Sequence, residues 1–249
     1  DQLDEHRELI HVKKEVDPEN NIGTLCHLAQ ERAIWMKNIK GHPGWTALAQ
    51  APANWRHLAM AMGVKQEELV FHVANLLSAT PTDPVFLNGE PAPCQEKVFS
   101  GKDADIGMLP AHLQSREDGG KCISASICVC KDPDTGKYNL SYHRMMPLGK
   151  QETGFLMLPR HMWRIYKKYE DKNQPMPIAA VIGHHPGFAL AGGISGTEEI
   201  DEIRLAGTFL GEPVRMVKAK SIDLEVPADA EIIVEGEIPP RTRKAEGPF

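Results

Sequence analysis

Residues 177–238 constrain the fold of this chain more strongly than any other segment. The apolar run Ile178–Ile182 predicts a buried strand, and it ends in a turn with the sequence Gly-His-His-Pro-Gly. A glycine-rich loop follows at 192–196, and a helical pattern then runs to a stop at Gly211. A strand, a glycine-rich turn and a helix N-terminus in this order form a binding place for phosphate.

The start of that helix is acidic, with carboxylates at Glu198, Glu199, Asp201 and Glu202. Carboxylates repel phosphate unless a cation lies between the two, so the segment predicts a metal ion. The plainer alternative is a solvated first helical turn, which the helix dipole favours. Two short β-like runs, at 214–218 and 231–235, complete the unit.

Length and charge narrow the class of protein. The 249 residues carry a net charge of −6, and the basic residues are not gathered on one segment, which argues against nucleic acid or an anionic membrane as partner. We expect no membrane span and no signal peptide, because no apolar run approaches the ~20 residues that a bilayer requires. Five cysteines at irregular spacing predict reduced thiols and a cytoplasmic location.

The sequence pattern before residue 85 predicts a mostly helical region. The expected elements are a helix over 2–8, a strand over 9–16, and helices over 25–33, 55–62 and 66–77. Thr24 and Asn54 directly precede two of these helices, and we expect both residues to act as N-caps.

Short apolar runs separated by turn residues begin at Val85 and predict β-structure. The turn sequence Asp-Pro-Asp-Thr-Gly at 132–136 lies between two β-rich runs, 122–131 and 138–145, which predicts a hairpin. Further expected elements are strands over 85–87 and 96–99 and a helix over 160–169. The pattern predicts an α+β protein with a β-barrel or sandwich and a soft domain boundary near residue 105.

Two motifs invite a metal interpretation but also have a plainer one. Cys128 and Cys130 share one face of a strand, but a zinc site needs four ligands and no second pair exists, so we expect small core residues. The adjacent residues His184 and His185 point in opposite directions at a strand end, which favours roles in the turn or in packing.

A better set of candidate ligands comes from three separate elements. Asn139 lies on the returning hairpin strand, His161 on the helix after Pro159, and Glu202 on the acidic helix. Oxygen, nitrogen and oxygen donors suit Mn²⁺ or Mg²⁺ with phosphate completing the shell, although spacing alone does not exclude ordinary structural roles. Arg144 is five residues after Asn139, so both side chains face one site only if the strand bends or bulges between them.

The sequence resembles the UbiD family of reversible decarboxylases, which use prenylated FMN. The resemblance runs along nearly the whole chain, and several motifs match in the correct order. These motifs are Asn139-x4-Arg144, Pro159-Arg160-His161, Glu202–Gly207, Leu224–Ala228, Ala230–Gly236 and Glu246–Phe249.

The resemblance implies an N-terminal α/β domain over 1–105 and, over 106–249, a cofactor-binding split β-barrel of the flavin-reductase type. It implies that Asn139, His161 and Glu202 hold Mn²⁺ (or Mg²⁺) against the cofactor phosphate. A K⁺ site is expected near Ala191, Gly192, Ile194 and Glu202. The expected cofactor contacts are Asn139, Tyr142, His143, Arg144, Arg160, His161, Gly192, Gly193, Ile194 and Glu202.

The same resemblance implies that Arg144 and Glu246 are catalytic, together with a second acid that the family motif places after Phe249. The family's C-terminal domain, which supplies the dimer contact, is also expected beyond that residue. We therefore expect residues 1–249 alone to be inactive, and the full-length protein to form a homo-oligomer.

The leading hypothesis is a carboxy-lyase acting on an aromatic or α,β-unsaturated carboxylic acid. A flavin- or phosphate-binding split-barrel protein without decarboxylase activity is the alternative, since a fold does not fix a function. A folded interaction module is a third hypothesis. A flavin chromophore and bound manganese in the purified protein would separate the first two from the third.

Overall fold

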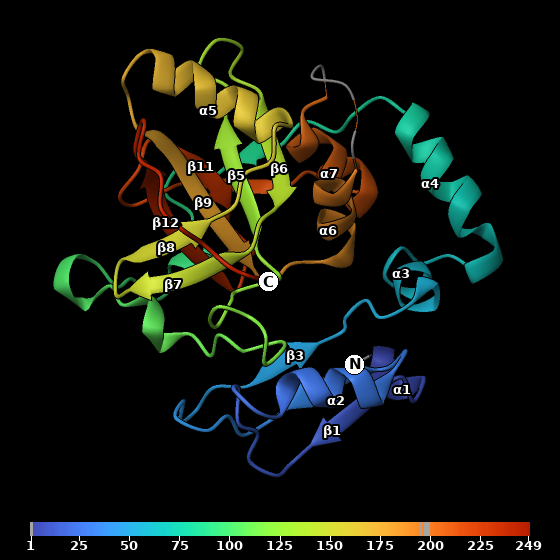
Figure 1. Cartoon of the computed structure of the whole chain (residues 1–249). Coiled ribbons are helices and arrows are strands. Elements are labelled where there is room, and N and C mark those ends of the chain that lie inside the picture. Colours follow the sequence, from blue (N-terminus) through green and yellow to red (C-terminus); the bar gives the residue numbers. More distant parts are fainter. Residues whose placement is uncertain (1, 195, 197–199) are drawn as a thin grey trace.

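The computed structural model describes residues 2–194, 196 and 200–249. A small N-terminal layer lies beside a larger region that is built mainly on antiparallel strands (Figure 1). The N-terminal sheet has the order β1-β2-β3, with β1 (Leu9–Val12) parallel to β2 (Ala33–Met36) and β3 (Ala47–Ala49) antiparallel to β2. Helices α1 (Gln2–Glu5) and α2 (Ile22–Ala29) complete this layer.

The predicted cap at Thr24 is wrong, since α2 begins at Ile22 after Asn21 and ends at Ala29. That helix was predicted to run to Ala33, but Ala33 begins β2, whose Ala33, Ile34 and Met36 are buried. Pairing with β1 on one side and β3 on the other outweighs the local helical pattern.

The predicted cap at Asn54 is confirmed, because its side chain accepts a hydrogen bond from the backbone N–H of His57 at the start of α3 (Trp55–Ala61). The helix predicted over 66–77 is a 3-10 turn, η1 (Gln66–Glu68), followed by α4 (Leu69–Ser78). Leu69 is buried, whereas Val70 and Phe71 are 72% and 75% exposed, so α4 covers little of the core.

The centre of the molecule is a four-stranded antiparallel sheet with the order β12-β9-β5-β6. Its strands are β5 (Ile127–Lys131), β6 (Tyr138–Tyr142), β9 (Met176–Ile182) and β12 (Ile232–Ile238). The predicted hairpin is confirmed by the pairing of β5 with β6, and the predicted buried run of 178–182 lies inside β9.

Alternate residues of this sheet enter two separate cores, as the period of a strand requires. Ile127 and Val129 pack with α6 (Pro186–Gly193) and α7 (Glu202–Leu210) on one face. Cys128 and Cys130 pack with α5 (His161–Asp171) on the other face, where both thiols are fully buried. The interpretation of the two cysteines as core residues is therefore confirmed.

The remaining strands form two small sheets. One is the hairpin β7 (Met145–Gly149) with β8 (Glu152–Phe155), and the other has the order β11-β10-β4, formed by Glu225–Pro227, Arg215–Lys218 and Val85–Phe86. The 3-10 helices η2 (Pro93–Gln95), η3 (Gly101–Asp103) and η4 (Ile106–Met108) occupy the connection after β4. The strand predicted over 96–99 is not formed, and the described residues contain no closed barrel.

Residues 177–238 fold into most of β9, then α6, α7, β10, β11 and β12. His185 caps α6 by accepting a hydrogen bond from the backbone N–H of Gly187, and the ring of His184 lies against that of Phe188, so both histidines have the turn and packing roles that were favoured. Asp201 caps α7, and Gly211 ends that helix in the left-handed conformation. Glu198 and Glu199 lie outside the described residues.

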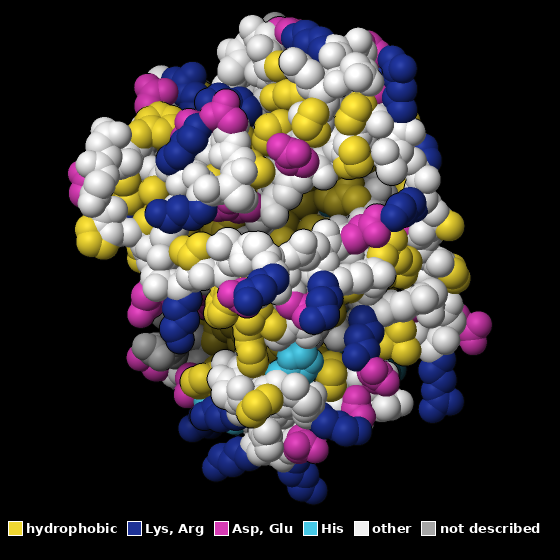
Figure 2. Space-filling view, turned by 90° about the vertical axis from the view of Figure 1, so that its left-hand side faces the viewer, with side chains coloured by type: hydrophobic (Ala, Val, Ile, Leu, Met, Phe, Trp, Pro, Cys, Tyr) yellow, Lys and Arg dark blue, Asp and Glu magenta, His cyan; other side chains and the backbone are white. Residues whose placement is uncertain are grey.

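Charges of both signs are interspersed on the face shown in Figure 2, around a hollow lined by hydrophobic side chains. None of the helices in the described part of the chain is long and apolar enough to cross a membrane.

Candidate active site

A cavity of about 680 Å³ lies where β6, the start of α5, the end of α6 and the start of α7 meet. All ten residues expected to contact the cofactor line it, although their roles remain predictions. The lining also includes six residues that the sequence analysis did not name: Leu140, Ser141, Leu156, Leu158, Met162 and Arg164. Helical spacing could have identified Arg164, which lies on α5 one turn after Arg160, the N-cap residue of that helix.

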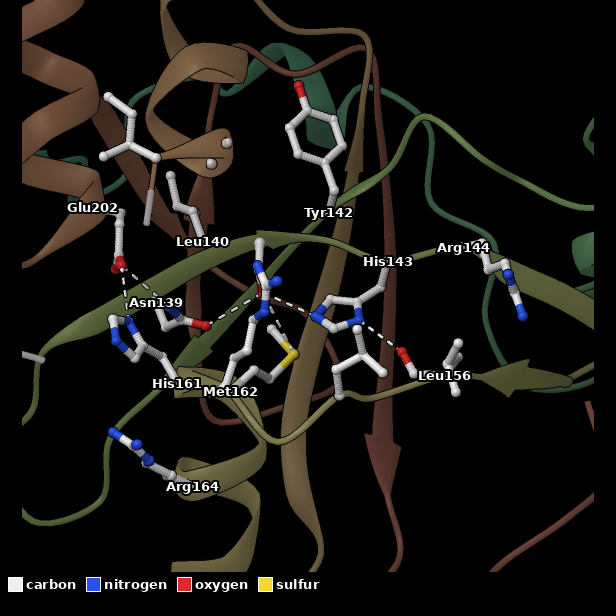
Figure 3. Close-up of a pocket in the computed structure, with 16 residues that line it drawn as sticks. Asn139, Leu140, Tyr142, His143, Arg144, Leu156, His161, Met162, Arg164 and Glu202 are labelled. Atoms are coloured by element: carbon white, nitrogen blue, oxygen red, sulfur yellow. Dashed lines mark hydrogen bonds and ion pairs between the residues drawn. The ribbon is translucent and has the colours of Figure 1, made fainter. Parts of the chain in front are cut away.

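At one end of the cavity, Asn139, His161 and Glu202 point toward one another (Figure 3). The Asn139 Nδ2 donates a hydrogen bond to Glu202 Oε1 at 3.3 Å, and His161 Nδ1 lies 3.8 Å from the same oxygen. Burial raises the pKa of the Glu202 carboxyl to about 7. A buried carboxylate of this kind is stabilised by a cation, so the donor set fits a divalent metal ion. Across the described residues, no group of three His, Cys, Asp or Glu side chains forms an alternative metal site.

A second chain of polar contacts leads from the carbonyl of Leu156 to Asn139. The carbonyl of Leu156 accepts from His143 Nδ1 at 2.9 Å, so the neutral ring presents Nε2 as an acceptor, and burial lowers the pKa of this histidine. The Ser141 hydroxyl lies 2.9 Å from that Nε2 and 3.4 Å from Asn139 Oδ1. Because the one hydroxyl proton goes to the nearer nitrogen, Asn139 Oδ1 keeps its lone pairs for another partner.

The raised pKa of Glu202 predicts a pH-dependent stability for the metal-free protein. The folded carboxyl holds its proton up to about pH 7, whereas an unfolded one has an ordinary value of 4.5. This contribution is therefore complete below about pH 4.5 and is lost as the pH rises toward 7. We expect a loss on the order of 3 kcal/mol in the free energy of unfolding across this range.

Urea unfolding at several pH values measures this loss, with Glu202→Gln as the reference because the amide does not titrate. The wild-type protein should become less stable relative to the variant as the pH rises, and added Mn²⁺ should reduce the difference. Parallel pH profiles for the two metal-free proteins would contradict the assignment.

At the other end of the cavity, Arg144 forms a two-pronged ion pair with Glu246 (Figure 3 shows Arg144 at the far side from Glu202). Arg144 Nε lies 2.7 Å from Glu246 Oε1, and Nη2 lies 2.9 Å from Oε2. The carboxylate raises the pKa of Arg144, and the ring of Phe249 packs 4.7 Å from the guanidinium carbon. Glu246 is only 8% exposed, so the pair is held out of bulk water.

The geometric objection to placing Asn139 and Arg144 in one site is resolved by an interruption of the sheet. Strand β6 ends at Tyr142 and β7 begins at Met145, so His143 and Arg144 lie in an irregular connection. This bend lets residues five apart line the same cavity.

The chain belongs to the UbiD family. A family model described as the 3-octaprenyl-4-hydroxybenzoate carboxy-lyase Rift-related domain matches residues 86–249, and the corresponding N-terminal domain model matches residues 1–77.

Among curated proteins, the chain is 39% identical over 146 residues to anhydromevalonate phosphate decarboxylase of Methanothermobacter thermautotrophicus, covering 59% of this chain and 34% of that protein. It is 29% identical over 266 residues to phenolic acid decarboxylase of Sedimentibacter hydroxybenzoicus, and the match covers 99% of this chain and 55% of that protein.

Among solved structures, the UbiD-class enzyme HmfF from Pelotomaculum thermopropionicum in complex with FMN matches with a TM-score of 0.95 and 33% identity, covering 100% of this chain and 56% of that one. An evolved dimeric form of HmfF in complex with prFMN matches with a TM-score of 0.94, also at 33% identity, covering 100% and 58%. The chain thus spans about half the length of the phenolic acid decarboxylase and of the two HmfF chains that it matches.

Proposed function

We propose that the full-length protein is a carboxy-lyase that uses prenylated FMN and a divalent metal ion to decarboxylate, reversibly, an aromatic or α,β-unsaturated carboxylic acid. The observation that carries the proposal is the placement of two groups at opposite ends of one cavity. Asn139, His161 and Glu202 form one group. The other is Arg144, which lines the cavity and is paired with Glu246 behind it.

At the first end, Asn139, His161 and Glu202 would hold Mn²⁺ or Mg²⁺, and the metal would hold the cofactor phosphate. Glu202 supplies the negative charge, and the contact of Ser141 with His143 leaves the amide oxygen of Asn139 with lone pairs for a cation. We also propose K⁺ near Ala191, Gly192, Ile194 and Glu202, because carbonyl oxygens at the end of a helix are suited to that ion.

At the second end, Glu246 would pass a proton to the product carbon, and the Arg144 fork would hold either the Glu246 carboxylate or the substrate carboxylate. Prenylated FMN, when bound, supplies an acceptor for the electron pair left on the substrate carbon as carbon dioxide departs. Tyr142, Leu156 and Leu158 also line the cavity, and all three are exposed, so they offer apolar surface that a bound flavin would cover.

Three broader features belong to the same proposal. The residues 1–105 and 106–249 form two domains, the second related to the split barrel of flavin reductases. The full-length protein supplies a second acid and a dimer contact from the part that the relatives have beyond this chain. The dimeric form of the evolved HmfF is consistent with a homo-oligomer.

Co-purification decides between this function and its alternatives. The full-length protein, produced in cells that make prenylated FMN, should show a flavin absorption spectrum, contain manganese by elemental analysis, and release carbon dioxide from members of a panel of aromatic and unsaturated acids. Flavin and metal without carbon dioxide release from any acid would favour the split-barrel flavin protein. The absence of both flavin and metal would favour an interaction module.

A further inference from the structure

The segment that carries Glu246 has little regular structure of its own. It follows β12 and comprises residues 239–249, here called the arm. Residues 241–245 are exposed, yet Glu246 must be placed accurately because displacement of a catalytic group by about 1 Å can cost about 10² in rate. Contacts outside the cavity therefore have to fix the arm.

One such contact is built around the buried carboxylate of Glu170, near the end of α5. Its side chain is 7% exposed and accepts hydrogen bonds from Tyr166 Oη at 2.6 Å, from Arg243 Nη2 at 2.8 Å and from the backbone N–H of Arg241 at 2.9 Å. Arg243 also donates from Nη1 to the Tyr166 hydroxyl at 2.8 Å and lies over its ring. Two residues of the arm are thus held by one charged group.

The far end of the arm rests on two glycines. The Gly119 N–H donates to the carbonyl of Pro248 at 2.8 Å, and a Cβ on Gly119 would lie 2.3 Å from the carbonyl oxygen of Gly247. A Cβ on Gly154 would lie 2.7 Å from Glu246 Cγ. The arm can approach the backbone at Gly119 and Gly154 only because neither residue has a side chain. This close packing, here called the glycine seat, leaves the arm little room to shift.

We infer that Glu170 is a positioning residue for Glu246, acting through Arg241 and Arg243. It fixes the arm three residues before Glu246, and the glycine seat fixes it directly after. The effect on turnover rests on the proposed function, whereas the anchoring of the arm does not. Glu170 touches neither the cavity lining nor Arg144, so its role is separate from binding of the cofactor.

Hydrogen–deuterium exchange tests the anchoring. The variants are Glu170→Gln, which keeps the shape of the side chain, and Arg243→Ala, whose side chain is 62% exposed and whose loss leaves the cores intact. Lys172→Ala is the matched control, because Lys172 also caps α5 and forms an ion pair, with Asp134 at 2.9 Å, that does not involve the arm. Exchange in peptides covering 239–249 should rise about ten-fold in the first two variants and stay unchanged in the control.

Two further measurements separate positioning from general loosening. FMN affinity should stay within about two-fold of wild type in all three variants, and in the full-length protein kcat should fall by about 10² in the Glu170 and Arg243 variants with little change in KM. Unchanged exchange in the arm of both variants, or an equal rise in Lys172→Ala, would overturn the inference. If the wild-type protein decarboxylates nothing, the proposed function fails, while the exchange data still decide whether Glu170 anchors the arm.

Discussion

Replacing Arg144 by alanine in the full-length protein is expected to lower decarboxylation by about 10²-fold or more while leaving flavin bound. The substitution removes both prongs of the pair with Glu246 and leaves that mostly buried carboxylate without its cation. Arg144→Lys should recover little of the loss, because an ammonium group cannot reproduce the planar fork. Steady-state carbon dioxide release, together with the flavin absorption of each variant, measures the effect.

Arg215→Lys is the matched control for this experiment. Arg215 pairs with Asp229 at 3.4 Å on the surface, away from the cavity. Replacing this arginine by lysine should change neither carbon dioxide release nor flavin absorption. Near-normal turnover in Arg144→Lys would show that two-pronged geometry is unnecessary. Loss of flavin from Arg144→Ala would instead show that the Arg144 side chain, and not only its backbone, holds the cofactor.

Glu202→Ala is expected to lower metal affinity by about 10²-fold or more and, with it, the retention of flavin. Glu202 is the buried charged member of the ligand set, and Asn139 and His161 alone offer no negative charge to the cation. Without the metal, a phosphate at this end of the cavity would lose one of its counter-charges, although Arg160 and Arg164 also line the cavity. Elemental analysis and flavin absorption after dialysis provide the measurement.

Glu8→Ala provides the comparison for a carboxylate that is partly buried but remote. Glu8 is 13% exposed and is paired with Arg56 and His57 in the N-terminal layer, so its removal should lower stability and leave metal content unchanged. Manganese content that is the same in Glu202→Ala as in wild type would remove Glu202 from the metal site.

The parts of the fold that could be predicted from sequence are those with strong local signals. The turn at 132–136, the cap at Asn54 and the stop at Gly211 each depend on a few neighbouring residues, and each is confirmed. The strand β2 was missed because its identity depends on pairing with β1 and β3, which the residues 33–36 do not encode locally.

The helix α6 was missed for a different reason. Gly192 and Gly193 predicted a loop, but they lie in the last turn of α6. A Cβ on Gly192 would lie 3.1 Å from the side chain of Ile127, so this glycine allows the helix to approach the sheet closely. A glycine required by close packing cannot be distinguished from a loop glycine by local sequence alone.

The candidate site could be assembled from sequence only with the help of the family resemblance. Spacing alone left Asn139 and Arg144 on opposite faces of a regular strand, and the interruption at His143 and Arg144 removes that obstacle. The contribution of Ser141 could not be foreseen, because it depends on the carbonyl of Leu156, which fixes the tautomer of His143 from another strand connection.

The interruption of the sheet after Tyr142 also sets the reach of the site. Asn139 and Arg144 are joined by five residues of chain, which span at most about 17 Å when fully extended. The backbone therefore limits the distance between the cation end and the proton-transfer end of the cavity. A ligand held by an anionic group at Asn139 has to be long enough to present its reactive atoms near Arg144, and inorganic phosphate or a short fragment occupies one end without reaching the other. Inserting or deleting a residue between these two positions would alter that spacing while leaving the chemical groups themselves unchanged.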